Sequence, residues 1–444
     1  MRIKSFYKVS LLPFFLPVVI INVNDRSVTG NLTMTNNDII AAAFKVWGRD
    51  FYRTTSLTDI ARELRVSKPA LYRHFKDKDA LLGAMNTAFF DDCADFLKSG
   101  FNKAVNAGDS RETYLLWIRT MAEYYLRNRE ALIFSLIRNY NGRDREALTK
   151  EFSDRGIDFG HPAFGERPSA TYPSKMQLSM ATLIFFVAQF HHQRCEIEGK
   201  SDENLAEDQV GRLLLEIEGW ITKGIRLNAK NVAAVDYPAL ERQAAATVFE
   251  DTEVNALLRA AAEAVAEAGP WETSMEMVAR RSGLSKSGLY AHFKNKQDML
   301  SQLFITEFTR IINHAKVQIE TSSVFEDQLY LAIISIVDYL RSRPEIFVAL
   351  DWIKTGRLDL GKEVPPRLYG IIKKIEIDAI RNFDQHLLVW MAQWILFMIV
   401  NTLALWPPNR TGQCKNWEKN LTEIPNECFR VLFRFIALGL EDLN

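Results

Sequence analysis

Two short stretches of this 444-residue chain combine basic, hydroxyl and aromatic side chains at the same spacing. The first is SKPALYRHFKDK, residues 67–78, and the second is SKSGLYAHFKNK, residues 285–296. Lys, Arg and His side chains donate hydrogen bonds to phosphate oxygens and to base edges, and hydroxyl groups do so as well. The sequence contains no Ser-His-Asp set, phosphate-cradling glycine loop or H-E-x-x-H string, so we expect a binding protein rather than an enzyme.

The residues around the first stretch predict two short helices joined by a tight turn. Either Thr55 or Ser56 can cap the first of them, and Ser67 can cap the second, where Pro69 falls in the first turn and costs little. Leu71 and Phe75 would anchor the second helix by their four-residue spacing and leave small and basic side chains pointing outward. This is the geometry of a helix that enters the major groove of DNA.

The same pattern occurs twice without a gap. We call residues 56–85 the first copy and residues 274–303 the second copy; they align at an offset of 218 residues. The identical pairs include Ala61/Ala279, Arg62/Arg280, Ser67/Ser285, Lys68/Lys286, Leu71/Leu289, Tyr72/Tyr290, His74/His292, Phe75/Phe293, Lys76/Lys294 and Lys78/Lys296. Each copy follows an amphipathic helical pattern and precedes a long helical region. The sequence therefore predicts an all-α chain of two similar halves, with the seam within residues 227–253.

The charge of the chain is balanced overall but locally basic in both copies. There are 55 basic and 55 acidic side chains, which argues against a protein that coats nucleic acid without selectivity. Residues 62–78 hold six basic residues against two acidic ones, and residues 280–296 hold five basic residues and no acidic one. The four cysteines are scattered, which indicates neither a zinc site nor a disulfide framework and fits a cytoplasmic protein without a cofactor.

Both copies resemble the signature of the tetracycline-repressor (TetR) family. The resemblance is carried by TSLTDIARELRVSKPALYRHFKDKDALL and ETSMEMVARRSGLSKSGLYAHFKNKQDML, in which a small residue precedes Leu-Tyr-x-His-Phe and a later Lys-x-Lys. It implies three N-terminal DNA-binding helices in each half, followed by a helical domain that dimerises and binds a small ligand, which we expect to be mostly apolar. The implied function is a DNA-binding transcription regulator, usually a repressor, acting on a double-stranded operator.

The resemblance also implies roles for individual positions. In the first copy, base contacts would come from Lys68, Pro69, Ala70 and Arg73, and phosphate contacts from Thr55, Ser56, Tyr72, His74 and Lys78. In the second copy, base contacts would come from Lys286, Ser287, Gly288 and Ala291, and phosphate contacts from Thr273, Ser274, Tyr290, His292 and Lys296. Arg73 is the expected guanine contact. Because Gly288 and Ala291 offer fewer specific side chains, the second helix would clamp DNA more than it selects a sequence.

The predicted domains follow from the two copies. Residues 34–84 and 246–303 would form the helix-turn-helix domains, and residues 85–235 and 304–444 the helical regulatory domains. Residues 1–33 hold a basic start and the apolar run VSLLPFFLPVVII. We expect this leader to lie outside the fold, with translation starting at Met34; a disordered extension and an export signal are the alternatives.

Two assemblies are open at this stage. The halves could pack on each other as a covalent pseudo-dimer, or whole chains could dimerise and present four recognition helices. We prefer the pseudo-dimer, which predicts an operator with two unequal half-sites about 34–36 Å apart.

Several other interpretations are weaker. The chain could be a helical ligand-binding or scaffolding protein that has lost DNA binding, or a sensor attached to a membrane through the leader or the apolar stretch 386–406. His191, His192 and Cys195 could form a metal site, although a polar helix end is the simpler interpretation. Four aromatic residues could line a ligand pocket but are better explained as residues of the hydrophobic core: Phe185, Phe186, Trp352 and Trp394.

Overall fold

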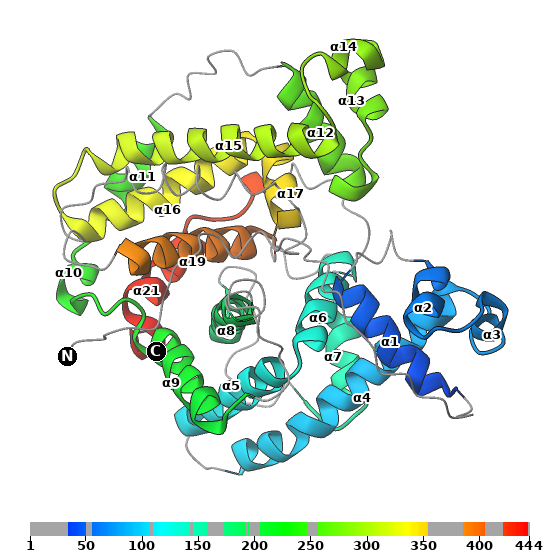
Figure 1. Ribbon diagram of the computed structural model, residues 1–444. Helices are drawn as coiled ribbons and strands as arrows, with labels where there is room; N and C mark the ends of the chain where they lie inside the picture. Colours follow the sequence, from blue (N-terminus) through cyan, green and yellow to red (C-terminus); the bar gives the residue numbers. More distant parts are fainter. Residues whose placement is uncertain are drawn as a thin grey trace. The chain divides into compact units, whose positions relative to one another are not determined.

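The computed structural model describes residues 34–49, 56–106, 110–142, 145–158, 173–191, 194, 205–246, 256–353, 385–404 and 421–442. Every regular element within these ranges is a helix, which confirms the predicted all-α class (Figure 1). The helices form two compact units, and the last boundary between them along the chain, at residues 214/215, falls inside one helix (Glu207–Lys223). The leader, residues 1–33, lies outside the described ranges. Among the described helices, none has the length and apolar character needed to cross a membrane, and this includes the helix at 385–404.

One unit contains the first copy. Its helices are α1 (Asn36–Arg49), α2 (Leu57–Glu63), α3 (Lys68–Tyr72), α4 (Lys78–Val105), α5 (Ser110–Arg127), α6 (Arg129–Gly142) and α7 (Arg145–Ser153), with the start of α9 (Glu207–Lys223). The long helices α4 and α5 pack on each other, and α6 packs on α1. Phe134 of α6 joins them, because its ring centroid lies 5.0 Å from that of Phe44 on α1 and 5.3 Å from that of Phe89 on α4. Helix α1 is thus connected to α4 and α6 by aromatic contacts.

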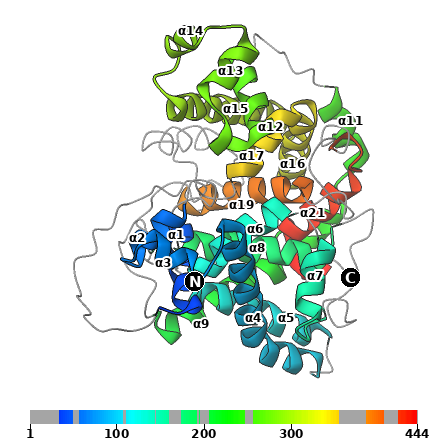
Figure 2. The ribbon, with the colours of Figure 1, turned by 90° about the vertical axis from the view of Figure 1, so that its right-hand side faces the viewer.

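The other unit contains the second copy. Its helices are α8 (Lys175–His191), the end of α9, α10 (Ala229–Ala233), α11 (Tyr237–Ala245), α12 (Ala256–Glu272), α13 (Met275–Ser282), α14 (Lys286–Tyr290), α15 (Lys296–Ile319), α16 (Phe325–Ser342), α17 (Pro344–Ile353), α19 (Gln385–Ala404), α21 (Glu427–Leu438) and the 3-10 helix η4 (Gly439–Asp442). The helices α13 and α14 lie beyond the N-terminal end of α15 (Figures 1 and 2). Here α17 packs on α12 as α6 packs on α1.

The two compact units do not coincide with the two halves of the sequence. Within the described residues, α8 and the end of α9 belong to the first half by sequence, yet they cluster with the helices of the second half. The physical reason is an aromatic core centred on Trp394 of α19, which is completely buried. Its ring centroid lies 5.1 Å from that of Trp220 on α9 and 6.1 Å from that of Phe186 on α8, and its indole N–H donates to Thr182 Oγ1 at 3.3 Å.

This core includes the last helix as well. Trp394 lies 6.5 Å from Phe435 of α21, and Phe185 of α8 lies 5.5 Å from Phe397 of α19. The buried Phe185, Phe186 and Trp394 are therefore core residues in this conformation. The side chain of Trp352 lies outside the described set.

The ends of α9 and α21 are joined through their backbones. The N–H of Ile225 donates to the carbonyl of Ile436 at 2.8 Å, and the N–H of Leu227 donates to the carbonyl of Ala437 at 3.0 Å. Gly224 has a left-handed φ of 52°, and a Cβ there would overlap the Ile436 carbonyl oxygen. The close approach therefore requires glycine at this position.

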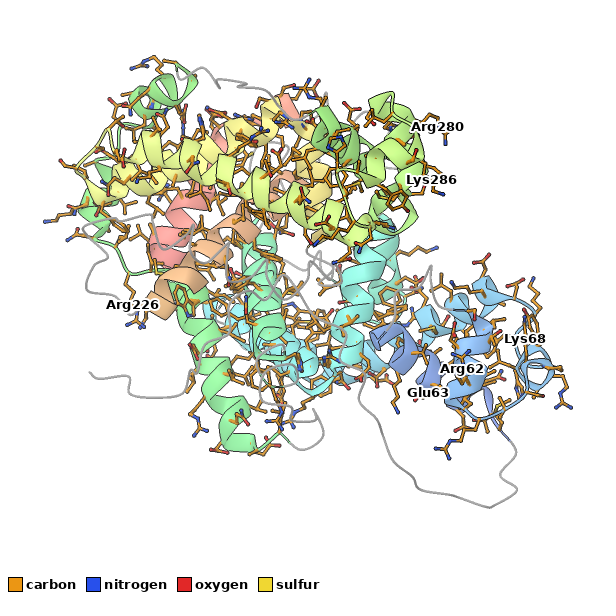
Figure 3. The ribbon with its side chains drawn as sticks, turned by 45° about the horizontal axis from the view of Figure 1, so that its top comes forward. Arg62, Glu63, Lys68, Arg226, Arg280 and Lys286 are labelled. Carbon is orange, nitrogen blue, oxygen red and sulfur yellow. The ribbon has the colours of Figure 1, made fainter. Side chains whose placement is uncertain are left out.

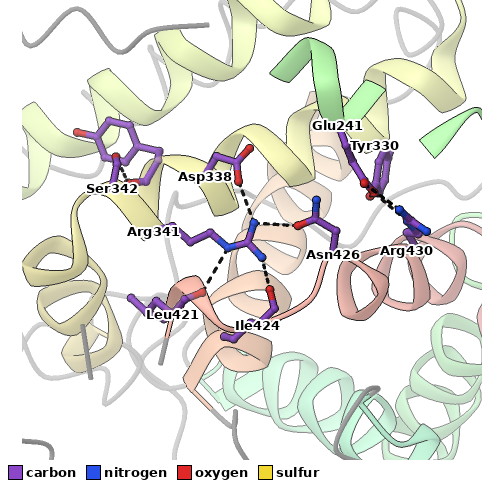
Figure 4. A network of polar contacts seen from close by, with 10 residues as sticks. Glu241, Tyr330, Asp338, Arg341, Ser342, Leu421, Ile424, Asn426 and Arg430 are labelled. Atoms are coloured by element: carbon purple, nitrogen blue, oxygen red, sulfur yellow. Dashed lines mark hydrogen bonds and ion pairs between the residues drawn. The ribbon is translucent and has the colours of Figure 1, made fainter. Parts of the chain in front are cut away.

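The segment after α9 is ordered and attached to the second half. Glu241 of α11 accepts two hydrogen bonds from the guanidinium of Arg430 on α21, both at 2.8 Å, and a third from the Tyr330 hydroxyl of α16 at 2.6 Å (Figure 4). Burial opposes the charge of Glu241, but the hydrogen bonds from Arg430 and Tyr330 prevail and lower its pKa. The described part of the predicted seam, residues 227–246, is therefore structured and packs with the helices of the second half.

Candidate nucleic-acid interface

The first copy folds by the caps that its sequence predicts. The Ser56 hydroxyl accepts from the N–H of Asp59, and the Asp59 carboxylate accepts from the N–H of Ser56 at 2.7 Å, which forms a capping box at the start of α2. Ser67 caps α3 by accepting from the N–H of Ala70. Leu71 of α3 and Phe75, which lies just beyond the end of that helix, are both buried and anchor it as expected.

The second copy repeats this design with one difference in the turn. Ser274 caps α13 and Ser285 caps α14, again through their hydroxyl oxygens. Gly283 ends α13 in the left-handed region at a φ of 71°, and the corresponding position of the first copy is Arg65, whose φ is 56°. The turn of the first copy thus holds Arg65 in the left-handed conformation, which is unfavourable for a residue with a Cβ.

Most of the residues predicted to face bases lie at the surface. The side chains of Lys68, Pro69 and Arg73 are exposed in the first copy, and Ala70 is half-buried. Lys286, Ser287 and Ala291 are exposed in the second copy, and Gly288 is half-buried. Figure 3 shows Lys68 projecting from α3, and Arg280 and Lys286 projecting from α13 and α14. Each recognition helix therefore offers a polar outer face that a duplex can contact.

The predicted phosphate contacts differ more in their surroundings. Tyr72 and Tyr290 are the aromatic residues of the two outer faces, with 43% and 45% of their surface exposed. His292 is exposed, whereas His74 is half-buried and its Nδ1 lies 2.7 Å from the Asn36 side-chain oxygen at the start of α1. This contact fixes the ring of His74 relative to α1.

The lysines that begin the long helices are less accessible. Lys78 and Lys296 are both half-buried at the first position of α4 and α15. Burial lowers the pKa of Lys296.

The structure corrects the expectation for Thr273. Its side chain is 1% exposed, and its hydroxyl donates to the Ala264 carbonyl of α12 at 3.1 Å. Two hydroxyl residues precede α13, and the cap is made by the second of them, Ser274. Thr273 therefore joins α12 to the start of α13, and its side chain is not presented to a phosphate. Its counterpart Thr55 lies outside the described residues.

One residue of the second copy was missed at the sequence level. Glu276, in the first turn of α13, forms an ion pair with Lys286 whose Nζ–Oε1 distance is 2.6 Å. The first copy has Thr58 at that position, and Lys68 instead lies over the ring of Tyr72, with Nζ 5.6 Å from the ring centroid. A position-by-position comparison of the two copies would have revealed the acid. The hydrogen bond and the charge of Lys286 lower the pKa of Glu276.

Comparison with known families identifies the two segments that contain these recognition helices. Residues 39–85 and 257–303 each match the family described as "Bacterial regulatory proteins, tetR family". The chain carries two TetR-family DNA-binding domains in tandem. The matched ranges contain α2 and α3 in one case and α13 and α14 in the other, so both TetR-type units hold a capped recognition helix.

Similar proteins are regulators. The chain is 26% identical over 86 residues to the HTH-type transcriptional regulator YhgD of Bacillus subtilis (strain 168), a match covering 19% of this chain and 45% of that protein. It is 23% identical over 160 residues to the "Fatty acid metabolism regulator protein" of the same organism, covering 34% of this chain and 82% of that protein. The chain thus matches less than half the length of the first relative.

Two solved structures are also similar. One is the fatty acid degradation regulator FadR of Bacillus halodurans, at 16% identity and a TM-score of 0.33, covering 42% of this chain and 100% of that one. The other is the TetR family regulator PfmR of Thermus thermophilus, at 21% identity and a TM-score of 0.28, covering 43% of this chain and 97% of that one.

The remaining weak interpretation concerns metal. Among the described residues, no group of three or more His, Cys, Asp or Glu side chains is arranged to hold a metal ion. His191 is described and buried, while His192 and Cys195 lie outside the described residues.

Proposed function

We propose that this protein is a sequence-specific transcription regulator that binds one asymmetric operator as a covalent pseudo-dimer. Each half supplies one recognition helix, α3 or α14. Because the outer faces of these helices differ, their two half-sites differ as well, with centres about 34–36 Å apart. Arg73 contacts a guanine in the half-site of the first copy, where the second copy offers only Ala291.

The observation that most supports a pseudo-dimer is the packing of α8 and the end of α9 against α19 and α21. In a TetR-type dimer these helix pairs would come from two chains, and here one chain supplies both pairs. Their contact is made by large buried side chains around Trp394, which is how an obligate interface is built. The backbone bonds of Ile225 and Leu227 to the end of α21 tie the same helices together. A second chain would have to displace this contact before a conventional dimer formed.

The regulatory helices would respond to a small, mostly apolar effector. Phe134 connects α6 to both α1 and α4, so a ligand that shifts α6 would reach the first DNA-binding domain through that ring. Such a ligand changes DNA affinity only if it prefers one of the two conformations. One of the relatives is named for the regulation of fatty acid metabolism, which makes an acyl chain a reasonable first effector to test.

Selection of DNA from a random library by the full chain tests the proposed function. We expect the enriched site to contain two half-sites of different sequence, with stronger selection in the one that contacts α3. A palindromic site would favour a dimer of whole chains. Failure to enrich any sequence would favour the alternative of a helical binding or scaffolding protein.

A further inference from the structure

The base-facing lysine of the second copy is held by an acid that the first copy lacks. Lys286 and Glu276 are 55% and 63% exposed at their side chains, and they form their ion pair at the surface. In the first copy Thr58 replaces the acid, so the only partner described for the Lys68 ammonium is the ring of Tyr72. Two lysines at equivalent positions thus have different partners, a carboxylate in the second copy and an uncharged aromatic ring in the first.

Both members of this pair lie on the surface expected to meet DNA. Glu276 is in the first turn of α13, and Lys286 is the first residue of α14. A DNA duplex carries one negative charge per about 1.7 Å of its axis. The carboxylate of Glu276 would therefore repel the DNA phosphates, whereas an uncharged threonine at this position would not. The pair therefore weakens binding twice, by occupying the ammonium group and by adding a negative charge.

We propose that Glu276 is a positioning residue that sequesters Lys286 and makes the second recognition helix a weak, sequence-tolerant partner of the first. This inference rests on the proposed DNA-binding function. It agrees with the small side chains at Gly288 and Ala291, which leave Lys286 as the main base-facing charge of α14. The first copy then selects the site, and the second copy holds the adjacent DNA with little base selectivity.

The size of the effect follows from counterion release. The logarithm of the association constant falls with the logarithm of salt concentration, with a slope of about −0.9 for each neutralised phosphate. One additional phosphate contact therefore raises the association constant at 0.1 M salt by about eightfold relative to 1 M salt. On a duplex of mixed sequence, which offers α14 no preferred base, the freed ammonium of Lys286 would neutralise a phosphate, so we expect an effect of this order.

The test compares the wild-type full chain with Glu276→Thr, which installs the residue of the first copy. Glu320→Gln is the matched control, because Glu320 also forms an exposed ion pair, with Lys316 at 3.5 Å, but lies at the far end of α15. The probe is a labelled duplex of mixed sequence, about 30 base pairs long, titrated by fluorescence anisotropy from about 50 to 200 mM salt. We expect Glu276→Thr to bind about five- to tenfold more tightly at about 0.1 M salt, with a slope steeper by about one.

The reciprocal change completes the design. Thr58→Glu should weaken binding and make the salt slope shallower. Glu320→Gln should change the association constant by no more than about twofold and leave the salt slope unchanged. Equal or weaker binding by Glu276→Thr, or an equal gain with Glu320→Gln, would overturn the inference. If instead Glu276→Gln loses selectivity for one base of the second half-site, Glu276 contacts that base itself, and the inference is wrong. A wild-type chain that binds no duplex at about 50 mM salt would refute the proposed function itself, a result distinct from all of these.

Discussion

The backbone junction between α9 and α21 predicts that Gly224→Ala strongly destabilises the unit that contains it. A left-handed conformation costs a residue with a Cβ about 1–2 kcal/mol. The new Cβ would also overlap the Ile436 carbonyl oxygen, which accepts from Ile225, and would push apart the neighbouring bond from Leu227 to Ala437. Each lost hydrogen bond adds about 0.5–1.5 kcal/mol, so we expect a total loss of about 2–5 kcal/mol.

Urea unfolding followed by circular dichroism and tryptophan fluorescence measures this loss. Trp220 and Trp394 lie in the affected core, and because the chain has two compact units, only the transition of one unit should shift. Gly219→Ala is the matched control, since Gly219 lies within α9, which ends directly before Gly224, and has open space around it; this variant should gain up to about 1 kcal/mol of stability. Equal stability of the Gly224→Ala variant and the wild type would refute the role that we assign to the junction.

Three further predictions concern the two copies and the connection between them. Arg73→Ala should cost about 1–3 kcal/mol of binding at one half-site and leave the other unchanged, measured on operators with one half-site scrambled; equal loss at both would reject the assignment. Arg65→Gly should raise the free energy of unfolding by about 0.5–1 kcal/mol and Gly283→Arg should lower it by about 1–2 kcal/mol in thermal unfolding; a stabilising Gly283→Arg would contradict the strain argument. Because the folded pKa of Glu241 is lowered, its contribution is present above its unfolded pKa of about 4.3 and is lost as the pH falls through the folded value. Glu241→Gln should therefore cost about 1–3 kcal/mol at neutral pH and flatten the acid limb of the stability curve, and an unchanged acid limb would show that another group controls it.

The local structure of both copies could be predicted because it depends on neighbouring residues. Serine caps at Ser67 and Ser285 and the buried pair Leu71 and Phe75 follow from type and spacing within a few positions. The same logic failed at Thr273, because two consecutive hydroxyl residues precede α13 and spacing does not say which of them caps it.

Contacts between distant parts of the chain could not be predicted in the same way. Apolar sequence indicates that α8 and α19 are buried, but it does not say that Thr182 would meet Trp394, more than two hundred positions away. The ion pair between Glu276 and Lys286 crosses the turn between two helices, so no helical period reveals it. The repeat itself held the missing signal, since one copy has threonine where the other has glutamate.

Native mass spectrometry of the full chain on its selected operator tests the pseudo-dimer most directly. We predict one chain of 50.9 kDa per duplex, with both half-sites protected from cleavage in that same complex. Two chains on the shortest duplex that binds, or one chain that protects a single half-site, would contradict the account.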